Sequence, residues 1–375
     1  MNIGITCYPT YGGSGIVATE LGMELAQRGH EVHFITYANP IRLDPGIPRI
    51  HYHEVEVSNY PLFQYPPYCL ALAGRMADVA ESYNLDLLHV HYAVPHSISA
   101  LLAQQMLAPH RRLPFVTTLH GTDITLVGSD ASYFSITKFS IERSDGVSSI
   151  SEYLRKETVD VFGVANEIRV IPNFVNCELY HPDDEKTGAA AYSPAGEKLL
   201  IHLSNFRPVK RATDCIRILA EVRKNVPAHL LMAGDGPDRG AAEHLTHQLK
   251  LDGHVTFLGK QNHVERLIPL AHVALLPSEL ESFGLAALEA MACGVVPVAT
   301  NVGGVPELIT PGEDGFLEPV GDIEAQAARV VALLSDDDLH YRMSKAGRLN
   351  AAASFCSEKI IPQYEKLYED VVAAQ

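Results

Sequence analysis

Closely spaced cysteines are missing from this sequence of 375 residues, because no two cysteines form a C-x-x-C pair. The six cysteines are Cys7, Cys69, Cys177, Cys215, Cys293 and Cys356. Their wide spacing is typical of reduced thiols in a cytoplasmic protein, and it favours neither a disulfide framework nor a zinc site.

Positive charge is also in short supply. Lys and Arg number 29 against 45 Asp and Glu, which gives a net charge of -16 and disfavours binding to nucleic acid or anionic lipid. The uncharged stretch 290–306 is interrupted by glycine and proline, so it is not expected to span a membrane. The opening "MNIGITCYPT" lacks the basic and apolar regions of a signal peptide. We therefore expect a cytoplasmic protein with no nucleic acid and no membrane among its partners.

Several well-known catalytic motifs are absent. The sequence has no H-E-x-x-H helix, no G-x-x-x-x-G-K-[ST] loop and no recognisable Ser-His-Asp order. Protease, zinc-peptidase and P-loop nucleotidase functions therefore have no support from motifs.

The pattern that is present is an alternation of short β-rich apolar runs with longer helix-period segments, which predicts an α/β fold with parallel sheets. The predicted strands are Ile3–Cys7, Val32–Thr36, Leu87–His91, Phe115–His120, Gly146–Ile150 and Ile168–Ile171, then Leu199–Leu203, His229–Ala233, Val255–Leu258, Val273–Leu276 and Val295–Ala299. We predict a Rossmann-like domain over 1–168 and a second over 169–357, with a final helix at about 358–375 that packs back on the first. Ligands of parallel sheets bind beyond the carboxyl ends of the strands, so two facing sheets would form an interdomain cleft.

The most informative segment is "PSELESFGLAALEAMACGVVPVATNVGGVPE", residues 277–307. A loop carries Glu281, and a helix is expected to begin near Gly284 and to carry Glu289 in its first two turns. Free amides at the helix start can bind a diphosphate, and Gly284 allows a ligand to approach closely. Carboxylates would repel phosphate, so both glutamates are better suited to sugar hydroxyls. The alternative is that Glu281 is a solvated loop charge and Glu289 a helix-surface carboxylate.

A basic segment, "SNFRPVKRATD" (204–214), follows a predicted strand and contains Asn205, Arg207, Lys210 and Arg211. Arginine can bind two phosphate oxygens at once, and lysine can neutralise charge on a leaving diphosphate. Arg207 and Arg211 both fit the arginine role. The alternative is an exposed basic first turn of a helix.

A glycine-rich loop, "YGGSG", follows the first predicted strand, and its Gly13 and Ser14 could bring amides close to phosphate. It is not G-x-G-x-x-G, and the second strand leads into "TYANPIR" without an acidic residue for a ribose. A dinucleotide site is therefore disfavoured, and a simple tight turn is the alternative.

Histidines cluster in "LHVHYAVPH" and "TTLHGTDIT", where His89, His91, His96 and His120 suggest a metal site. No cysteine or acidic ligand is placed near them, and buried histidines with hydrogen bonds are commoner, so we expect no metal. His120 differs because it follows its strand and precedes "GTD", at the edge of the predicted cleft.

The segment with Glu281, "FGL", Glu289 and "EAMACG" resembles the Glu-x7-Glu motif of retaining glycosyltransferases with the GT-B fold. That resemblance implies that the catalytic residues are His120, Arg207, Lys210 and Glu281. It implies a donor site made of Gly13, Ser14, Asn205, Arg207, Lys210, Arg211, Glu281, Ser282, Phe283, Gly284, Leu285 and Glu289. In particular, Glu281 would contact the donor sugar and Glu289 the ribose. The family's Gly-Arg and Lys-Gly pattern is replaced here by Ser204-Asn205 and Lys210-Arg211, which leaves the arginine role open.

Longer strings resemble one branch of these enzymes, the N-acetylglucosaminyl L-malate synthase family of bacillithiol biosynthesis. They are "GITCYPTYGGSGIVATELG", "LHVHYAVPHSISA", "TTLHGTDIT", "SNFRPVKR" and "ESFGLAALEAMACG". The resemblance implies transfer of N-acetylglucosamine from UDP-GlcNAc to the hydroxyl of L-malate with retention, without a metal or other cofactor.

L-Malate is a dianion with one hydroxyl, so its site needs cations and hydroxyl groups in the amino-terminal domain. The candidates are Ser14, Tyr92, Thr122 and Lys138, with Arg42, Arg75 and Arg143 in reserve, although each arginine fits a surface position equally well.

Three other functions stay open. They are the same reaction with another acceptor such as inositol phosphate, a UDP-GlcNAc 2-epimerase of the same architecture, and a UDP-sugar sensor without catalysis. A homo-oligomer is also left open by the sequence.

Overall fold

The computed structural model describes residues 1–44, 46–58, 61–108, 110–183, 185–193 and 196–374. The chain divides into two compact units, each of which is described by itself. The first unit comprises Met1–Asn173 with Ile360–Gln375, and the second comprises Phe174–Lys359. The boundary that we predicted at 168/169 falls at the first residue of a strand, Ile168–Val170.

The first unit is built on a parallel sheet of seven strands in the order β3-β2-β1-β4-β5-β6-β7. The strands are β1 Asn2–Thr6, β2 Glu31–Thr36, β3 Ile50–Glu54, β4 Leu87–His91, β5 Phe115–Leu119, β6 Gly146–Ser149 and β7 Ile168–Val170. The central strands β4 and β5 are buried along their whole length, as expected of a parallel sheet covered on both faces. The strand order reverses between β1 and β4, which is where sheets of this kind bind ligands.

Helices connect and cover this sheet. They are α1 Gly13–Gln27, α2 Tyr68–Tyr83, α3 Ile98–Leu107, α4 Thr122–Thr125, α5 Phe134–Arg143 and α6 Glu152–Phe162, with an irregular π-type segment η1 at Ala93–Ser97. α2 and α3 pack against each other, and Leu72, Met76 and Ala100 bury their side chains in one cluster with β4 and β5 residues.

The last helix, α13 (Ser357–Ala373), packs on the first unit from Ile360 onward. The Tyr368 hydroxyl lies 2.7 Å from Nδ1 of His89 on β4, and both side chains are buried. Gly146 at the start of β6 leaves room for this helix, because a Cβ atom there would lie 2.7 Å from Val371. The end of the chain thus completes the core of the unit in which the chain begins.

The second unit repeats the architecture with six parallel strands in the order β10-β9-β8-β11-β12-β13. The strands are β8 Lys198–Ser204, β9 Ala228–Gly234, β10 Val255–Gly259, β11 Val273–Leu276, β12 Val296–Thr300 and β13 Phe316–Glu318. Here the order reverses between β8 and β11. Two Rossmann-like parallel sheets confirm the predicted α/β fold class.

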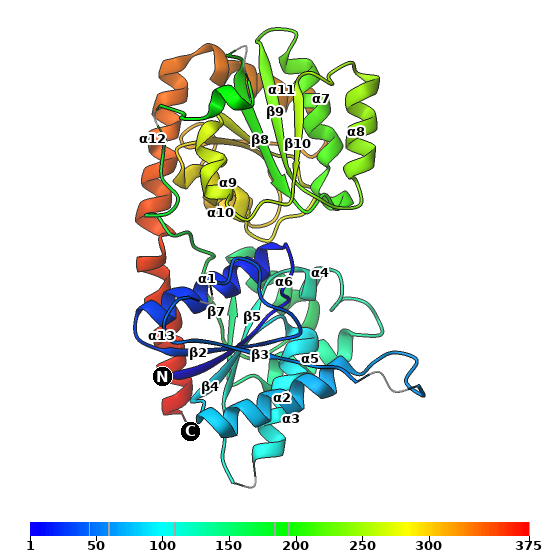
Figure 1. The fold of residues 1–375 in the computed structure, drawn as a ribbon, viewed down its shortest axis with the longest axis vertical. Helices are drawn as coiled ribbons and strands as arrows, with labels where there is room; N and C mark the ends of the chain where they lie inside the picture. The colour runs from blue at the N-terminus through cyan, green and yellow to red at the C-terminus, as the bar shows by residue number, and fades with distance from the viewer. Residues whose placement is uncertain (45, 59–60, 109, 184, 194–195, 375) are drawn as a thin grey trace. The chain divides into compact units, whose positions relative to one another are not determined.

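The helices of the second unit are α7 Ala212–Val222, α8 Arg239–Gln248, α9 Leu285–Ala292, α10 Val305–Leu308, α11 Ile323–Ser335 and α12 Asp337–Ser354. Single 3-10 turns lie at Ala189–Ala191, Pro208–Lys210, Val264–Arg266 and Ile268–Leu270. α7 packs against α8, α11 and β9, and α12 packs against α9 (Figure 1). The apolar face of α7 carries Ile216, Leu219 and Val222 into the core of this unit.

The prediction that all cysteines are reduced is wrong for one pair. Cys177 and Cys356 form a disulfide with a Cα–Cα distance of 5.6 Å, although 179 positions separate them. An isolated β-bridge between Val175 and Cys356 brings the first and last segments of the second unit together. Spacing along the chain does not reveal such a pairing. Cys7, Cys69, Cys215 and Cys293 are free thiols.

Within the described ranges, every helix is either too short or too polar to cross a bilayer.

Candidate active site

The loop between β1 and α1 brings the chain tightly around the start of α1. Gly13 and Ser14 are the first two residues of this helix, so their amides belong to its first turn. Gly15 lies against the loop, because a Cβ atom there would be 2.4 Å from the carbonyl oxygen of Tyr8. Close packing of the loop against α1 therefore requires glycine at position 15, whether or not a ligand binds there.

A row of three hydroxyl groups lies beside this helix start. Ser14 Oγ donates to the Tyr92 hydroxyl at 3.2 Å, and the Tyr92 hydroxyl lies 3.2 Å from Thr122 Oγ1. The three residues come from the start of α1, the position directly after β4 and the start of α4. The structure thus unites three of the four predicted acceptor residues, at the point where the strand order reverses. We call Ser14, Tyr92 and Thr122 the hydroxyl row.

His120 extends the hydroxyl row on one side. Its ring stacks on Tyr92 with centroids 5.5 Å apart, and its Nε2 lies 2.8 Å from Nδ1 of His91. Burial, and then the proximity of His96, lower the pKa of His120 to about 3. His120 is therefore a neutral imidazole at physiological pH, able to donate or accept one hydrogen bond but not to act as a cation.

Asp123 joins the loop after β4 to the loop after β5, and it was not predicted from the sequence as a site residue. Its carboxylate accepts hydrogen bonds from the amides of Ala93, His120 and Gly121 at 2.9–3.1 Å. The side chain is buried, and burial raises its pKa although these amides lower it. The signal in the sequence was an aspartate three residues after a strand-end histidine.

Lys138 and two of the three reserve arginines interact with residues outside the hydroxyl row. Lys138 Nζ on α5 lies 3.7 Å from Glu142, and within the described residues no hydrogen bond or ion pair links it to the hydroxyl row. Arg42 forms an ion pair with Glu20 at 2.8 Å, while the Arg143 guanidinium lies over the Phe139 ring. Arg75 is the remaining reserve residue, and its Nε is buried without a hydrogen-bond partner in the described structure.

The histidines of the first unit form hydrogen bonds. Both ring nitrogens of His89 have partners at 2.7 Å, Thr118 Oγ1 and the Tyr368 hydroxyl. Nδ1 of His96 lies 2.5 Å from the carbonyl oxygen of His91. These contacts agree with our interpretation of the cluster as buried core histidines, although Nε2 of His91 and Nε2 of His96 are buried without a hydrogen-bond partner among the described residues.

In the second unit, the two predicted donor segments meet where the strand order reverses. The Glu279 amide donates to the Val209 carbonyl at 2.8 Å, which joins the loop after β11 to the loop after β8. Lys210 Nζ lies 2.5 Å from Glu281 Oε1, and Ser278 Oγ donates to the same oxygen at 3.0 Å. The basic segment and the first glutamate therefore form one site.

The helix α9 begins four residues after Glu281, and the amides of its first turn lack helical partners. Gly284 caps the helix with φ of 98°, a left-handed conformation that favours glycine. In the preceding loop, the Gly304 amide donates to the main-chain carbonyl of Glu281 at 3.0 Å. Ser282 follows Glu281 in the same loop. The Phe283 ring is buried against Phe355, so only the backbone of Phe283 is available to a ligand. The amides at Gly284 and Leu285 open a helix of eight residues and suit a phosphate.

Neither glutamate is a solvated surface charge. The Glu281 side chain is only 15% exposed and has two polar partners. Glu289 is buried, and the Tyr180 hydroxyl donates to its Oε1 at 3.0 Å. The alternative, in which Glu281 is a solvated loop charge and Glu289 a helix-surface carboxylate, is therefore wrong.

The two competing arginines differ in their surroundings. Arg211 Nε donates at 2.6 Å to the buried carboxylate of Asp214. Arg207 is exposed, and no hydrogen bond or ion pair engages its guanidinium group among the residues described. Arg207 is thus available to a phosphate, whereas Arg211 is already paired. Asn205 directly follows β8. Its Oδ1 is buried and has no hydrogen-bond partner among the described residues.

A further glycine-rich loop, after β9, also packs into this site and was missed. A Cβ atom on Gly234 would lie 1.8 Å from the Ser204 carbonyl oxygen, and one on Gly236 would lie 1.9 Å from that of Asn205. His202 fixes the same region, with Nδ1 2.8 Å from the Leu275 carbonyl oxygen and Nε2 2.8 Å from Ser204 Oγ. The sequence "GDG" directly after a predicted strand was the available signal.

Comparison with known proteins agrees with this geometry. Residues 11–179 match the protein family described as Glycosyltransferase Family 4, and residues 183–350 match the one described as Glycosyl transferases group 1. The chain is 48% identical over 373 residues to N-acetyl-alpha-D-glucosaminyl L-malate synthase of Bacillus anthracis, with 99% of this chain and 97% of the relative covered.

Two more distant proteins are also similar. The D-inositol 3-phosphate glycosyltransferase of Nocardia farcinica is 27% identical over 372 residues, with coverage of 91% of this chain and 81% of that protein. The crystal structure of Anabaena Alr3699/HepE in complex with UDP and glucose superposes with a TM-score of 0.83 at 19% identity, covering 98% of both chains. At that identity the superposition shows the fold alone, which is GT-B. The chain is therefore a glycosyltransferase, and it belongs to the same family as the Bacillus anthracis enzyme.

Proposed function

We propose that this enzyme transfers N-acetylglucosamine from UDP-GlcNAc to the hydroxyl group of L-malate with retention of the anomeric configuration, the first step of bacillithiol biosynthesis. The observation that carries the proposal is the 48% identity, over nearly the whole chain, to a relative with that name. The hydroxyl row of the first unit and the paired donor loops of the second supply the groups that such a reaction needs.

The second unit is proposed to bind the donor. A diphosphate would accept hydrogen bonds from the amides at Gly284 and Leu285, and Arg207 and Lys210 would add positive charge. Glu281 and Glu289 are proposed to accept hydrogen bonds from the sugar and the ribose. The Tyr180 hydroxyl donates to Oε1 of Glu289 and so orients the carboxylate for this role.

Lys210 is proposed to stabilise the leaving group. Its ammonium group is held by Glu281, so it is positioned before charge develops on the departing diphosphate. Such preorganised charge lowers the barrier more than a mobile side chain would, because little reorganisation is needed during the reaction.

The first unit is proposed to bind the acceptor. Malate carries two carboxylates and one reactive hydroxyl, and the hydroxyl row places three polar hydroxyl groups side by side. The low pKa of His120 makes its imidazole a weak base, so it would orient groups and not remove the malate proton. We propose that an oxygen of the leaving phosphate accepts that proton, with attack on the face from which UDP departs.

No metal or other cofactor is proposed for the transfer, because Arg207 and Lys210 provide cationic groups for the diphosphate. Activity should therefore persist in excess EDTA. Complete loss of activity that is restored by magnesium would contradict this part of the proposal.

The deciding experiment measures UDP release from UDP-GlcNAc across a panel of hydroxy acids and inositol phosphates, with the product identified by mass. We expect a product with L-malate. A product with inositol phosphate alone would favour the second candidate, for which the Nocardia farcinica relative is the supporting observation. Free N-acetylmannosamine from the donor alone would indicate an epimerase, and UDP binding without release would indicate a sensor.

We also propose a cytoplasmic location, supported by four free thiols among the six cysteines. The bond between Cys177 and Cys356 is of a kind uncommon in that compartment. Alkylation of thiols in intact cells, followed by mass analysis of the peptide containing Cys356, would test whether this bond forms in the cell.

A further inference from the structure

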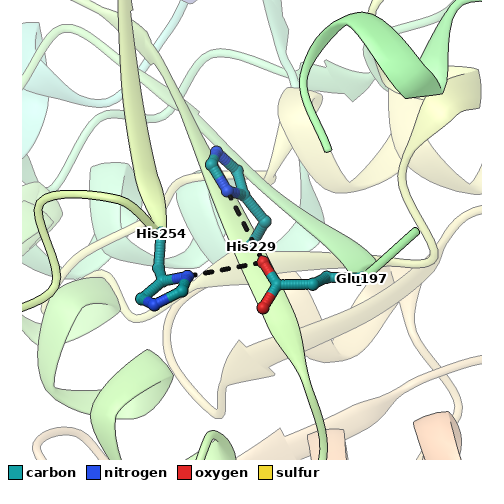
Figure 2. A group of neighbouring side chains, drawn as sticks. All are labelled: Glu197, His229 and His254. Carbon is teal, nitrogen blue, oxygen red and sulfur yellow. Dashed lines mark hydrogen bonds and ion pairs between the residues drawn. The ribbon is translucent and has the colours of Figure 1, made fainter. Parts of the chain in front are cut away.

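Two histidines and a glutamate gather at one edge of the second sheet. Glu197 immediately precedes β8, His229 is the second residue of β9, and His254 immediately precedes β10. Since β9 lies between β8 and β10 and all three strands are parallel, the residues meet at the amino-terminal edge. Figure 2 shows both imidazole rings directed at the Glu197 carboxylate. The donor loops follow the carboxyl ends of β8 and β11, at the opposite edge.

The separations between ligand atoms are close to those around a small metal ion. Glu197 Oε2 lies 3.4 Å from His254 Nδ1 and 3.9 Å from His229 Nδ1. One ligand atom from each of the three residues falls within 4.8 Å of the other two. A tetrahedral ion with bonds of about 2.0–2.1 Å separates its ligands by about 3.3 Å. Small side-chain adjustments would therefore complete the site.

The outer contacts hold two ligands in the required orientation. His229 Nε2 lies 2.8 Å from Thr256 Oγ1, so its Nδ1 is the nitrogen that faces the group. Arg223 Nη1 donates to Glu197 Oε1 at 2.7 Å and also donates to the Ala228 carbonyl, which leaves Oε2 directed at the histidines. Metal-binding histidines and carboxylates in proteins commonly have such outer hydrogen bonds.

The site is accessible from solvent. His254 is 35% exposed, which gives an ion and a water ligand access.

We propose that Glu197, His229 and His254 bind a divalent transition-metal ion of the zinc class, with water completing the coordination. Two imidazoles and a carboxylate form a ligand set typical of zinc and cobalt. Such an ion would join the amino-terminal ends of β8, β9 and β10, and it is distinct from the sugar-transfer site. The competing interpretation is a hydrogen-bonded cluster in which the carboxylate simply accepts both imidazole N–H groups.

Titration of metal-free protein with Co²⁺ and Zn²⁺ separates the two interpretations. We expect one tightly bound ion, visible absorption bands of low-symmetry Co²⁺, and displacement of Co²⁺ by Zn²⁺. His254→Gln and Glu197→Gln should abolish this binding class. His247→Gln is the matched control, because His247 forms an exposed pair with Asp252 in the same unit and lacks a third ligand among the described residues. Absence of a tight ion, or equal binding by the wild type and both site variants, would overturn the proposal.

Two further measurements keep the test decisive if a ligand variant fails to fold. Thr256→Val removes only an outer contact of His229, and it should weaken Zn²⁺ binding about 10–100-fold. Crystals of the wild-type protein soaked in Zn²⁺ should give an anomalous peak within about 2.0–2.2 Å of Glu197 Oε2 and both Nδ1 atoms. Unchanged affinity in Thr256→Val, or an anomalous peak only at other histidines, would contradict the site.

Discussion

Replacing Lys210 with methionine tests the proposed stabilisation of the leaving group. The substitution keeps most of the apolar stem of the side chain but removes the ammonium group 2.5 Å from Glu281 Oε1. We expect a large fall in kcat together with a moderate loss of stability. The two effects have separate physical causes and can be measured separately.

The magnitudes follow from the surroundings of the pair. The Lys210 and Glu281 side chains are 23% and 15% exposed, between an exposed ion pair and a buried one. Removing one partner costs less than about 1 kcal/mol at the surface and about 3–5 kcal/mol in the interior. Since Ser278 continues to donate to Glu281, we expect a loss of about 1–2 kcal/mol in the free energy of unfolding. Loss of a preorganised group at a developing charge lowers kcat by about 10²–10³.

The assay combines steady-state UDP release with urea unfolding of the same samples. Lys224→Met is the matched control, because Lys224 also pairs with a glutamate, Glu221, but is 65% exposed. The control should change the free energy of unfolding by less than about 0.5 kcal/mol and leave kcat unchanged. If Lys210→Met unfolds more easily but keeps the wild-type kcat, the lysine only holds the two loops together, and the proposed role in catalysis is refuted.

Three other predictions concern neighbouring groups. Arg207→Met should lower kcat/KM for UDP-GlcNAc at least tenfold, because it removes a phosphate contact worth about 1.4 kcal/mol or more. Arg211→Met should mainly lower the free energy of unfolding, because Arg211 pairs with Asp214. Steady-state kinetics and urea titration of both variants distinguish the two effects. Tyr180→Phe removes a hydrogen bond to the buried Glu289 carboxylate, so unfolding should become about 1.5–3 kcal/mol easier and KM for the donor should rise. The pKa of His120 is about 3 in the folded protein but about 6.5 when unfolded, so only the unfolded state gains protons as pH falls from 6.5 towards 4. The free energy of unfolding should therefore decrease by up to about 1.4 kcal/mol per pH unit for this residue, as measured by urea titration at several pH values.

Each of these predictions has a result that would contradict it. Equal kinetic effects of Arg207→Met and Arg211→Met would remove the distinction drawn from the Asp214 pairing. Tyr341→Phe, the control for Tyr180→Phe, changes an exposed tyrosine in the same unit, and equal stability in the two variants would count against a hydrogen bond to Glu289. A stability that is independent of pH between 7 and 4 would contradict the buried, neutral state of His120.

The regular core of both sheets could be predicted because its signals are local. β4 and β5 are uninterrupted buried runs, and their predicted ends differ from the structure by at most one residue. β3 (Ile50–Glu54) was missed because the edge strand alternates histidine and glutamate with apolar residues and is mostly accessible. β13 (Phe316–Glu318) was missed because three residues carry no period.

The residues of the site could likewise be predicted only where their signals are local. The N-terminal cap Gly284 and the pair Glu281 and Glu289 lie within one segment, so their local arrangement could be predicted. The hydrogen bond from Tyr180 to Glu289 joins residues 109 positions apart, so no local pattern predicts it. The group of Glu197, His229 and His254 was missed for the same reason, since each residue comes from a different strand edge. Contacts across a sheet depend on strand order, which spacing along the chain does not encode.

The central claim is that the second unit binds the diphosphate of a sugar nucleotide at the start of α9. A crystal structure of the enzyme with UDP-GlcNAc tests it most directly. The account predicts phosphate oxygens within about 2.7–3.2 Å of the Gly284 or Leu285 amide and of Lys210 Nζ. A nucleotide bound elsewhere, with Lys210 still engaged only by Glu281, would contradict it.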